Sequence, residues 1–175
     1  PNFLQKFYKL LGHKKKTIRK EACWVLSNIT AGNEHQVEAI MGDSDFAKAM
    51  IEIAEKDIPE VQREAAWALS NATKNCTIQQ LISMVDNGLM RCFIGLLDSK
   101  EPRTLEIVLE GLWNILNWGA LLAKDQKLDD NPFLVQLDNA EAVPKIEELQ
   151  VHPNTEVYLK ALRILENHFE LDSFL

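Results

Sequence analysis

Residues 64–73 read EAAWALSNAT, and residues 21–30 read EACWVLSNIT, the same motif forty-three positions earlier. A third, altered copy reads EGLWNI from Glu110, and it places an asparagine at the same interval again. The three asparagines are Asn28, Asn71 and Asn114. A period in the forties, carried by helix-forming residues, is typical of stacked helical repeats. The motif therefore predicts an all-α, right-handed solenoid with three helices per repeat.

The motif predicts two functional faces on each long helix. Glu, Trp and Asn stand at i, i+3 and i+7, so they share one face. A second stripe is apolar and lies about a quarter turn away; in the first copy it consists of Ile18, Ala22, Val25 and Ile29. We expect the apolar stripe to pack between repeats. The polar stripes of stacked repeats should then form a row along one side of the molecule.

Glycine and proline punctuation divides the chain into helices. We expect a short helix over residues 3–11, ending at Gly12. The further helices are predicted at 15–30, 34–41, 45–56, 59–73, 77–86, 89–97, 102–123, 132–137, 141–150 and 155–169, with a polar loop at 124–131. The predicted array comprises a partial repeat at 1–32, repeats at 33–75 and 76–123, and a capping repeat at 131–170. Because the first helix matches the middle helix of a repeat, we expect the chain to be part of a longer solenoid.

The last repeat has lost the motif. Ile164 stands where the asparagine would be, and Lys160 stands in the tryptophan position. A terminal repeat that keeps its packing face and loses its ligand face is expected of a cap.

Composition narrows the class of function. The 175 residues are 46% hydrophobic and 26% charged, and the net charge is −7. This charge argues against nucleic acid and favours basic partners. No apolar run approaches the ~20 residues of a membrane span, and no signal peptide is evident, so we expect no membrane partner.

The sequence carries no recognisable catalytic or metal-binding arrangement. The four histidines are scattered, no nucleophile has a base in register, and no glycine-rich phosphate loop is present. Cys23, Cys76 and Cys92 form no C-x-x-C pair, which predicts buried free thiols in a reducing compartment. We therefore expect neither enzymatic activity nor a cofactor or metal.

The asparagine row is suited to holding an extended peptide. A side-chain amide offers two donors and one acceptor. Repeated once per helix spacing of ~8–10 Å, it can pair with every second or third residue of a chain that rises ~3.3 Å per residue. The alternative is that each asparagine bonds only to backbone within the solenoid.

The tryptophans add a preference for basic side chains. Trp24 and Trp67 stand one helical turn before their asparagines, and neighbouring indoles would form a slot for the methylene stem of Lys or Arg. Glu21, Glu64 and Glu110 would supply charge for the cationic tips. We expect the contribution of Glu64 to fall in high salt, as for an exposed charge. The alternative is that both tryptophans are core residues, although Leu26 and Leu69 already hold the core register.

The motif, with Ala31-Gly32 after its first copy, resembles the armadillo repeats of the importin-alpha (karyopherin-alpha) family of nuclear-import adaptors. The resemblance covers essentially the whole chain and corresponds to repeats seven to ten, at the C-terminal end. It implies a minor binding site for nuclear localisation signals. The residues that match this site are Trp24, Ser27 and Asn28 in the first copy, Glu64, Trp67 and Asn71 in the second, and Glu110 and Asn114 in the third.

The sequence departs from the family's pattern at one position, and the resemblance implies several partners. Trp113 fills the serine slot of the third copy, which could alter or block that end of the groove. The resemblance implies Lys/Arg-rich signal peptides of cargo proteins as ligands and shuttling between cytoplasm and nucleus. It also implies contacts of the last repeats with an export receptor and nucleoporins, and of importin-beta with an N-terminal segment that this chain lacks. The alternative function is an armadillo scaffold that binds another extended peptide without selecting basic residues.

Overall fold

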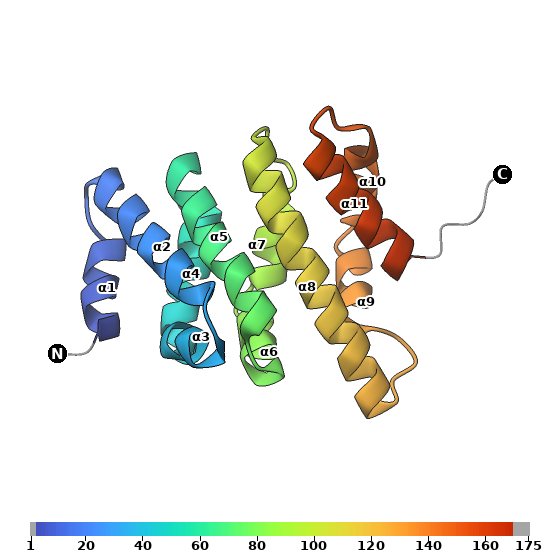
Figure 1. The fold of residues 1–175 in the computed structure, drawn as a ribbon, viewed down its shortest axis with the longest axis horizontal. Helices are drawn as coiled ribbons and strands as arrows, with labels where there is room; N and C mark the ends of the chain where they lie inside the picture. Colours follow the sequence, from blue (N-terminus) through green and yellow to red (C-terminus); the bar gives the residue numbers. More distant parts are fainter. Residues whose placement is uncertain (1–2, 170–175) are drawn as a thin grey trace. The chain divides into compact units, whose positions relative to one another are not determined.

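The computed structural model describes residues 3–169, and every regular element in that range is a helix (Figure 1). The elements are α1 (Phe3–Leu11), α2 (Lys16–Thr30), α3 (Glu34–Met41), α4 (Ser44–Lys56), α5 (Pro59–Asn75), α6 (Ile78–Asp86), α7 (Leu89–Leu96), α8 (Pro102–Gln126), α9 (Pro132–Asn139), α10 (Val143–Glu148), the 3-10 helix η1 (Leu149–Val151) and α11 (Thr155–His168). Every predicted helix is present, which confirms the all-α architecture.

Several helix ends differ from the sequence prediction by one to three residues, and two of these differences have a clear local cause. Helix α8 continues one turn further than predicted and closes at Lys127, whose φ of 54° is left-handed and whose N–H donates to the Ala123 carbonyl. The helix predicted at 141–150 is shorter and ends in the 3-10 turn η1. In both places, local backbone turns that propensity does not encode set the boundary.

Helix starts follow the capping rules. Asn33 and Thr77 form capping boxes with the glutamines three residues later, at the first residues of α3 and α6. Prolines occupy the first turn of α5, α8 and α9, where a missing N–H costs nothing. The Asn87-Gly88 stop is confirmed, and Gly88 adopts a φ of 102° that favours glycine.

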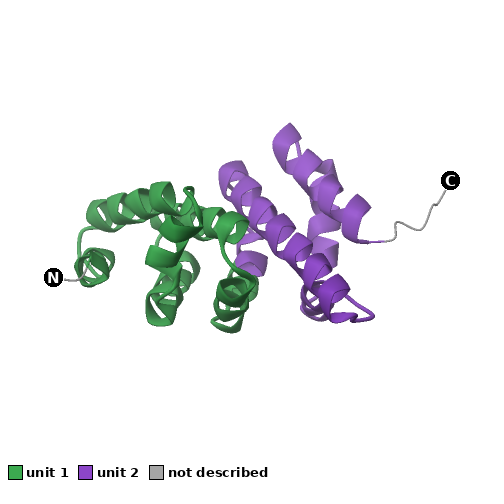
Figure 2. Cartoon of the chain, turned by 60° about the horizontal axis from the view of Figure 1, so that its bottom comes forward, with its two compact units in different colours: residues 1–92 green, residues 93–175 purple. Residues whose placement is uncertain are grey.

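The chain forms two compact units, residues 1–92 and residues 93–175 (Figure 2). In the first unit, α2 and α5 pack side by side, with α3 and α4 beneath them (Figure 1). Leu26 on α2 and Leu69 on α5 are both fully buried, as predicted. Thr30 Oγ1 crosses the interface and donates to the Ala68 carbonyl at 2.8 Å.

Helices α2 and α5 run parallel, turn against turn. Lys16 pairs with Glu60 near their first turns at 3.4 Å. Asn75 donates to the Gly32 carbonyl at 2.7 Å beyond the end of α2. Both contacts join residues 43 or 44 positions apart, so residues that share a motif position lie at nearly the same height on the two helices.

The apolar stripe is buried on α5 and only partly buried on α2. Val61 and Ala68 on α5 are fully buried, as predicted. Val25 occupies the position on α2 that Ala68 occupies on α5, and it is 38% exposed. Ile18 and Ile29 on α2 are half-buried. On α2 the stripe is therefore only partly covered by the described residues of this unit, with Ala22 buried and Val25 exposed. Helix α5 packs about a quarter turn away from this stripe on α2, where Cys23, Leu26 and Thr30 are buried.

In the second unit, α8 packs against α9 and α11 (Figure 1). Asn131 ties the start of α9 to α8 by donating from Nδ2 to the Leu116 carbonyl at 2.8 Å. Gly111 lies against the ring of Phe93, and a Cβ added there would stand 2.4 Å from Phe93 Cε2. Glycine is thus required in the middle of α8 by a close approach.

All three cysteines are buried and free, as predicted. Burial raises the pKa of the Cys76 and Cys92 thiols to about 12. Burial also raises the pKa of Cys23 to about 12, with a smaller contribution from the carboxylates of Asp57 and Glu64. Thiols in this state are inert at neutral pH.

Candidate functional site

The first motif lies on the outward side of α2. Trp24 is 47% exposed, and Glu21 and Asn28 on the same helix are exposed as well. A tryptophan that is half solvent-accessible does not fill a core. The core interpretation of Trp24 is therefore wrong, and its indole face remains available for a ligand.

The second motif places its residues deeper. Trp67 and Asn71 on α5 are half-buried. Since α2 and α5 are aligned turn for turn, Trp67 lies beside the Trp24 turn of the neighbouring helix, one helix spacing of ~8–10 Å away. The two tryptophan positions therefore lie on adjacent turns of neighbouring helices in the first unit, and the slot between them stays a prediction.

Glu64 is the most unusual residue of the site. It is only 7% exposed, whereas the sequence predicted a solvent-accessible charge. Its nearest cation is the guanidinium of the adjacent Arg63, whose nitrogen lies 3.6 Å from Oε1, beyond hydrogen-bond distance. Its Oε2 is buried and accepts no hydrogen bond from the described residues. A buried, poorly paired carboxylate is costly, and it favours any cation that reaches it.

Asn71, the second asparagine of the row, has an internal structural role. Asn71 Nδ2 donates to the Ser27 carbonyl at 3.0 Å and so links α5 to α2. This contact is the alternative that the sequence left open, and it occupies one N–H of the amide. The second N–H and the carbonyl oxygen of Asn71 are left for another partner. Asn28, on the exposed side of α2, lies where its amide is accessible.

Ser27 is buried and contributes through its backbone. Its hydroxyl donates to the Trp24 carbonyl at 2.7 Å within the same helix, and its own carbonyl receives Asn71. The serine position thus supports the tryptophan and the asparagine.

The third copy lies in the second unit and is already engaged. Asn114 is half-buried on α8. The Glu110 carboxylate accepts hydrogen bonds from Lys160 and from Arg163 of α11, the latter at 2.9 Å. Burial opposes the shift, but these two cations hold the pKa of Glu110 below its usual range. Sequence reasoning missed this pairing, and the basic residue in the tryptophan position of the last repeat was the only signal for it.

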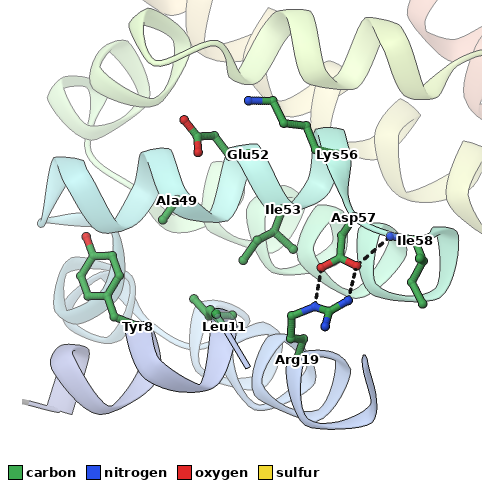
Figure 3. Close-up of a pocket in the computed structure, with 10 residues that line it drawn as sticks. Tyr8, Leu11, Arg19, Ala49, Glu52, Ile53, Lys56, Asp57 and Ile58 are labelled. Carbon is green, nitrogen blue, oxygen red and sulfur yellow. Dashed lines mark hydrogen bonds and ion pairs between the residues drawn. The ribbon is translucent and has the colours of Figure 1, made fainter. Parts of the chain in front are cut away.

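A separate hollow of about 560 Å³ opens between α1, α2 and α4 in the first unit (Figure 3). At its edge, Arg19 Nε and one terminal nitrogen donate to the two carboxylate oxygens of Asp57, each at 2.7 Å. This hydrogen bonding lowers the pKa of Asp57. The two charges satisfy each other, so the hollow does not match the cation site that the motifs predict.

Among residues 3–169, none of the helices has the length and hydrophobicity of a membrane-spanning segment. No group of three or more His, Cys, Asp and Glu side chains is placed to hold a metal ion in that range.

Comparison with known proteins shows which protein family shares this fold. Residues 1–31 match the model of the armadillo/beta-catenin-like repeat, and residues 131–173 match that of the atypical Arm repeat. The fold is similar to a designed armadillo repeat protein solved in complex with the peptide (KR)4, with a TM-score of 0.78, 26% identity, and 93% of this chain and 63% of that chain covered. An engineered protein of solved structure matches in fold with a TM-score of 0.79, 24% identity, and coverage of 94% of this chain and 62% of its own. The chain is therefore an armadillo-repeat protein.

The sequence relatives narrow the family. The chain is 38% identical to importin subunit alpha-4 of Arabidopsis thaliana over 91% of its length, and 41% identical to importin subunit alpha-1b of Oryza sativa over 91%. Each alignment covers 30% of the relative, so the chain spans about a third of their length. These matches confirm the resemblance to the armadillo repeats of the importin-alpha family.

Proposed function

We propose that this chain is part of a nuclear-import adaptor and binds extended Lys/Arg-rich localisation signals along α2 and α5. The observation that carries this proposal is the buried Glu64 carboxylate with its unpaired Oε2. A lysine or arginine that passes between Trp24 and Trp67 would bring a cation toward it. The similarity to importin alpha subunits and to an armadillo protein that holds a (KR)4 peptide supports the same ligand class.

Each residue has a distinct task in this proposal. The indoles of Trp24 and Trp67 pack on the methylene stem and attract the cation, a cation–π contribution of ~0.5–2 kcal/mol. Glu64 receives the charged tip. Asn28 and Asn71 hold the peptide backbone and so add affinity without reading side chains.

The test compares a lysine-rich peptide with its alanine-substituted twin by isothermal titration calorimetry. We expect the unmutated chain to bind the basic peptide and to bind the twin feebly. The double variant Trp24→Ala/Trp67→Ala should lose most of the basic peptide's affinity at every salt concentration, because stem burial depends little on salt.

The peptide-binding test has one control variant and one result that would overturn the proposal. Val25→Ala, on the same helix but on its apolar stripe, should leave peptide affinity unchanged. Equal affinity of the unmutated chain for the basic peptide and its twin would overturn the import-adaptor proposal and favour an armadillo scaffold without basic selectivity.

A further inference from the structure

The second unit contains a cation site that is filled from within the chain. Glu110 and Trp113 stand one turn apart on α8, at the tryptophan and serine positions of the motif, so this copy also pairs a carboxylate with an indole, three residues later in the register than Glu64 and Trp67 on α5. Lys160 of α11 donates to Glu110 Oε2. The guanidinium carbon of Arg163 lies 4.3 Å from the centre of the Trp113 ring, and one of its terminal nitrogens donates to the same Glu110 oxygen.

The contacts of Arg163 are those that a bound basic side chain would make. An arginine stacked on an indole, with its charge on a carboxylate, combines a cation–π contact with a charge-assisted hydrogen bond. Two cations share one carboxylate, so the cluster carries a net charge of +1. An incoming basic side chain therefore meets an occupied ring and an excess of like charge.

The fit of this internal arginine is incomplete. Arg163 Nε is buried without a hydrogen-bond partner, and Nε2 of His168, whose ring meets Trp113 edge-on at 5.2 Å, is also buried and unpaired. If these residues served only to hold α11 against α8, their buried nitrogens would be expected to have hydrogen-bond partners. The cluster is better described as a ligand site with a tethered occupant.

We propose that Lys160 and Arg163 act as an internal basic ligand that blocks a peptide-binding site formed by Glu110 and Trp113. This inference rests on the proposed function, because it assigns the same ligand class to a second carboxylate–indole pair. Its consequence is a specificity rule: α8 does not accept basic side chains while α11 is in place, and the chain binds them only through its first unit.

The experiment opens this site while the first one is disabled. The starting protein is the whole chain with Trp24→Ala and Trp67→Ala, and the probe is the peptide (KR)4 in calorimetry at about 0.1 M salt. Adding Lys160→Gln and Arg163→Gln should raise its affinity by about ten-fold or more, the effect of one charge-assisted hydrogen bond regained. Further addition of Glu110→Gln should abolish the gain.

Matched controls separate blocking from a general charge effect. Lys145→Gln with Arg103→Gln also removes two positive charges from the second unit, but away from the cluster. Lys145 pairs with Asp98, and Arg103 pairs with Glu106. This double variant should produce less than one third of the gain. Circular dichroism checks that each variant is folded. Should the glutamine variant unfold, it is replaced by Lys160→Ala with Arg163→Ala, because alanine favours the helix and leaves the Trp113 ring clear.

The outcomes are distinct from those that test the first unit. No gain in a folded variant, or an equal gain in the Lys145/Arg103 control, overturns the blocking role and leaves the first-unit proposal untouched. Failure of the unmutated chain to prefer basic peptides overturns the first-unit proposal, while the opened variant still reports on α8.

Discussion

Replacing Glu64 with glutamine should change the stability of the fold and the affinity for a basic peptide in opposite directions. The substitution keeps the shape of the side chain and removes the buried negative charge. Glu64 is 7% exposed, and its Oε2 accepts no hydrogen bond from residues 3–169, so the cost of removing this carboxylate from water is only partly offset, by Arg63 at 3.6 Å. We expect Glu64→Gln to raise the free energy of unfolding by up to about 1 kcal/mol, part of the desolvation cost of such a group.

The same substitution should weaken basic peptides. Exchanging a charge-assisted hydrogen bond for a neutral one costs about 1–2 kcal/mol, which is roughly 5- to 30-fold in affinity. Calorimetry with a lysine-rich peptide measures the loss, and urea unfolding measures the stability gain. A variant that is more stable but binds the peptide less tightly would indicate that Glu64 serves ligand binding at a cost to stability.

Salt provides a second criterion. Raising salt from about 0.1 M to about 1 M shortens the Debye length from ~10 Å to ~3 Å, but buried pairs are screened much less. The Glu64→Gln penalty should therefore largely persist in high salt, in contrast to the expectation for an exposed charge. Glu60→Gln, on the same helix and paired with Lys16 at a 53% exposed position, is the matched control and should change affinity by less than two-fold. Unchanged peptide affinity in Glu64→Gln, or a loss that vanishes in high salt, would refute the reasoning.

Three further predictions concern stability. Gly111→Ala should lower the free energy of unfolding by about 1–2 kcal/mol in urea titrations, because overlap with the buried Phe93 ring outweighs the ~1 kcal/mol that alanine contributes to helix formation; a stabilised variant would show that the ring yields. Thr30→Val should cost about 1 kcal/mol in the same assay by removing the hydrogen bond to Ala68 between α2 and α5, and no loss would contradict that role. Burial lowers the pKa of His168, so the unfolded chain takes up a proton first as pH falls below about 6.5, and thermal stability should decline between pH 7 and pH 5. His168→Gln should flatten this decline, and an unchanged pH profile would exclude His168 as its cause.

Much of the local structure was predictable because it depends on neighbours in the chain. The 43-residue period and the proline and glycine punctuation placed every helix within about a turn. They also placed Trp24 on an exposed face, since a residue that shares a face with Asn28 cannot also share one with Leu26. The resemblance of the motif to the importin-alpha repeats rested on the same local letters.

Tertiary packing decided the electrostatics of the site. Whether Glu64 is exposed depends on what α2 places above it, and the sequence of α5 alone carries no record of that. The Asn71 bond to Ser27 and the pairing of Glu110 with Lys160 and Arg163 join residues 44 to 53 positions apart. Such contacts depend on how helices lie against each other, which a helical period does not specify. The sequence by itself determined which residue types line α2, α5 and α8, and only the tertiary structure decided which of their charges are already satisfied.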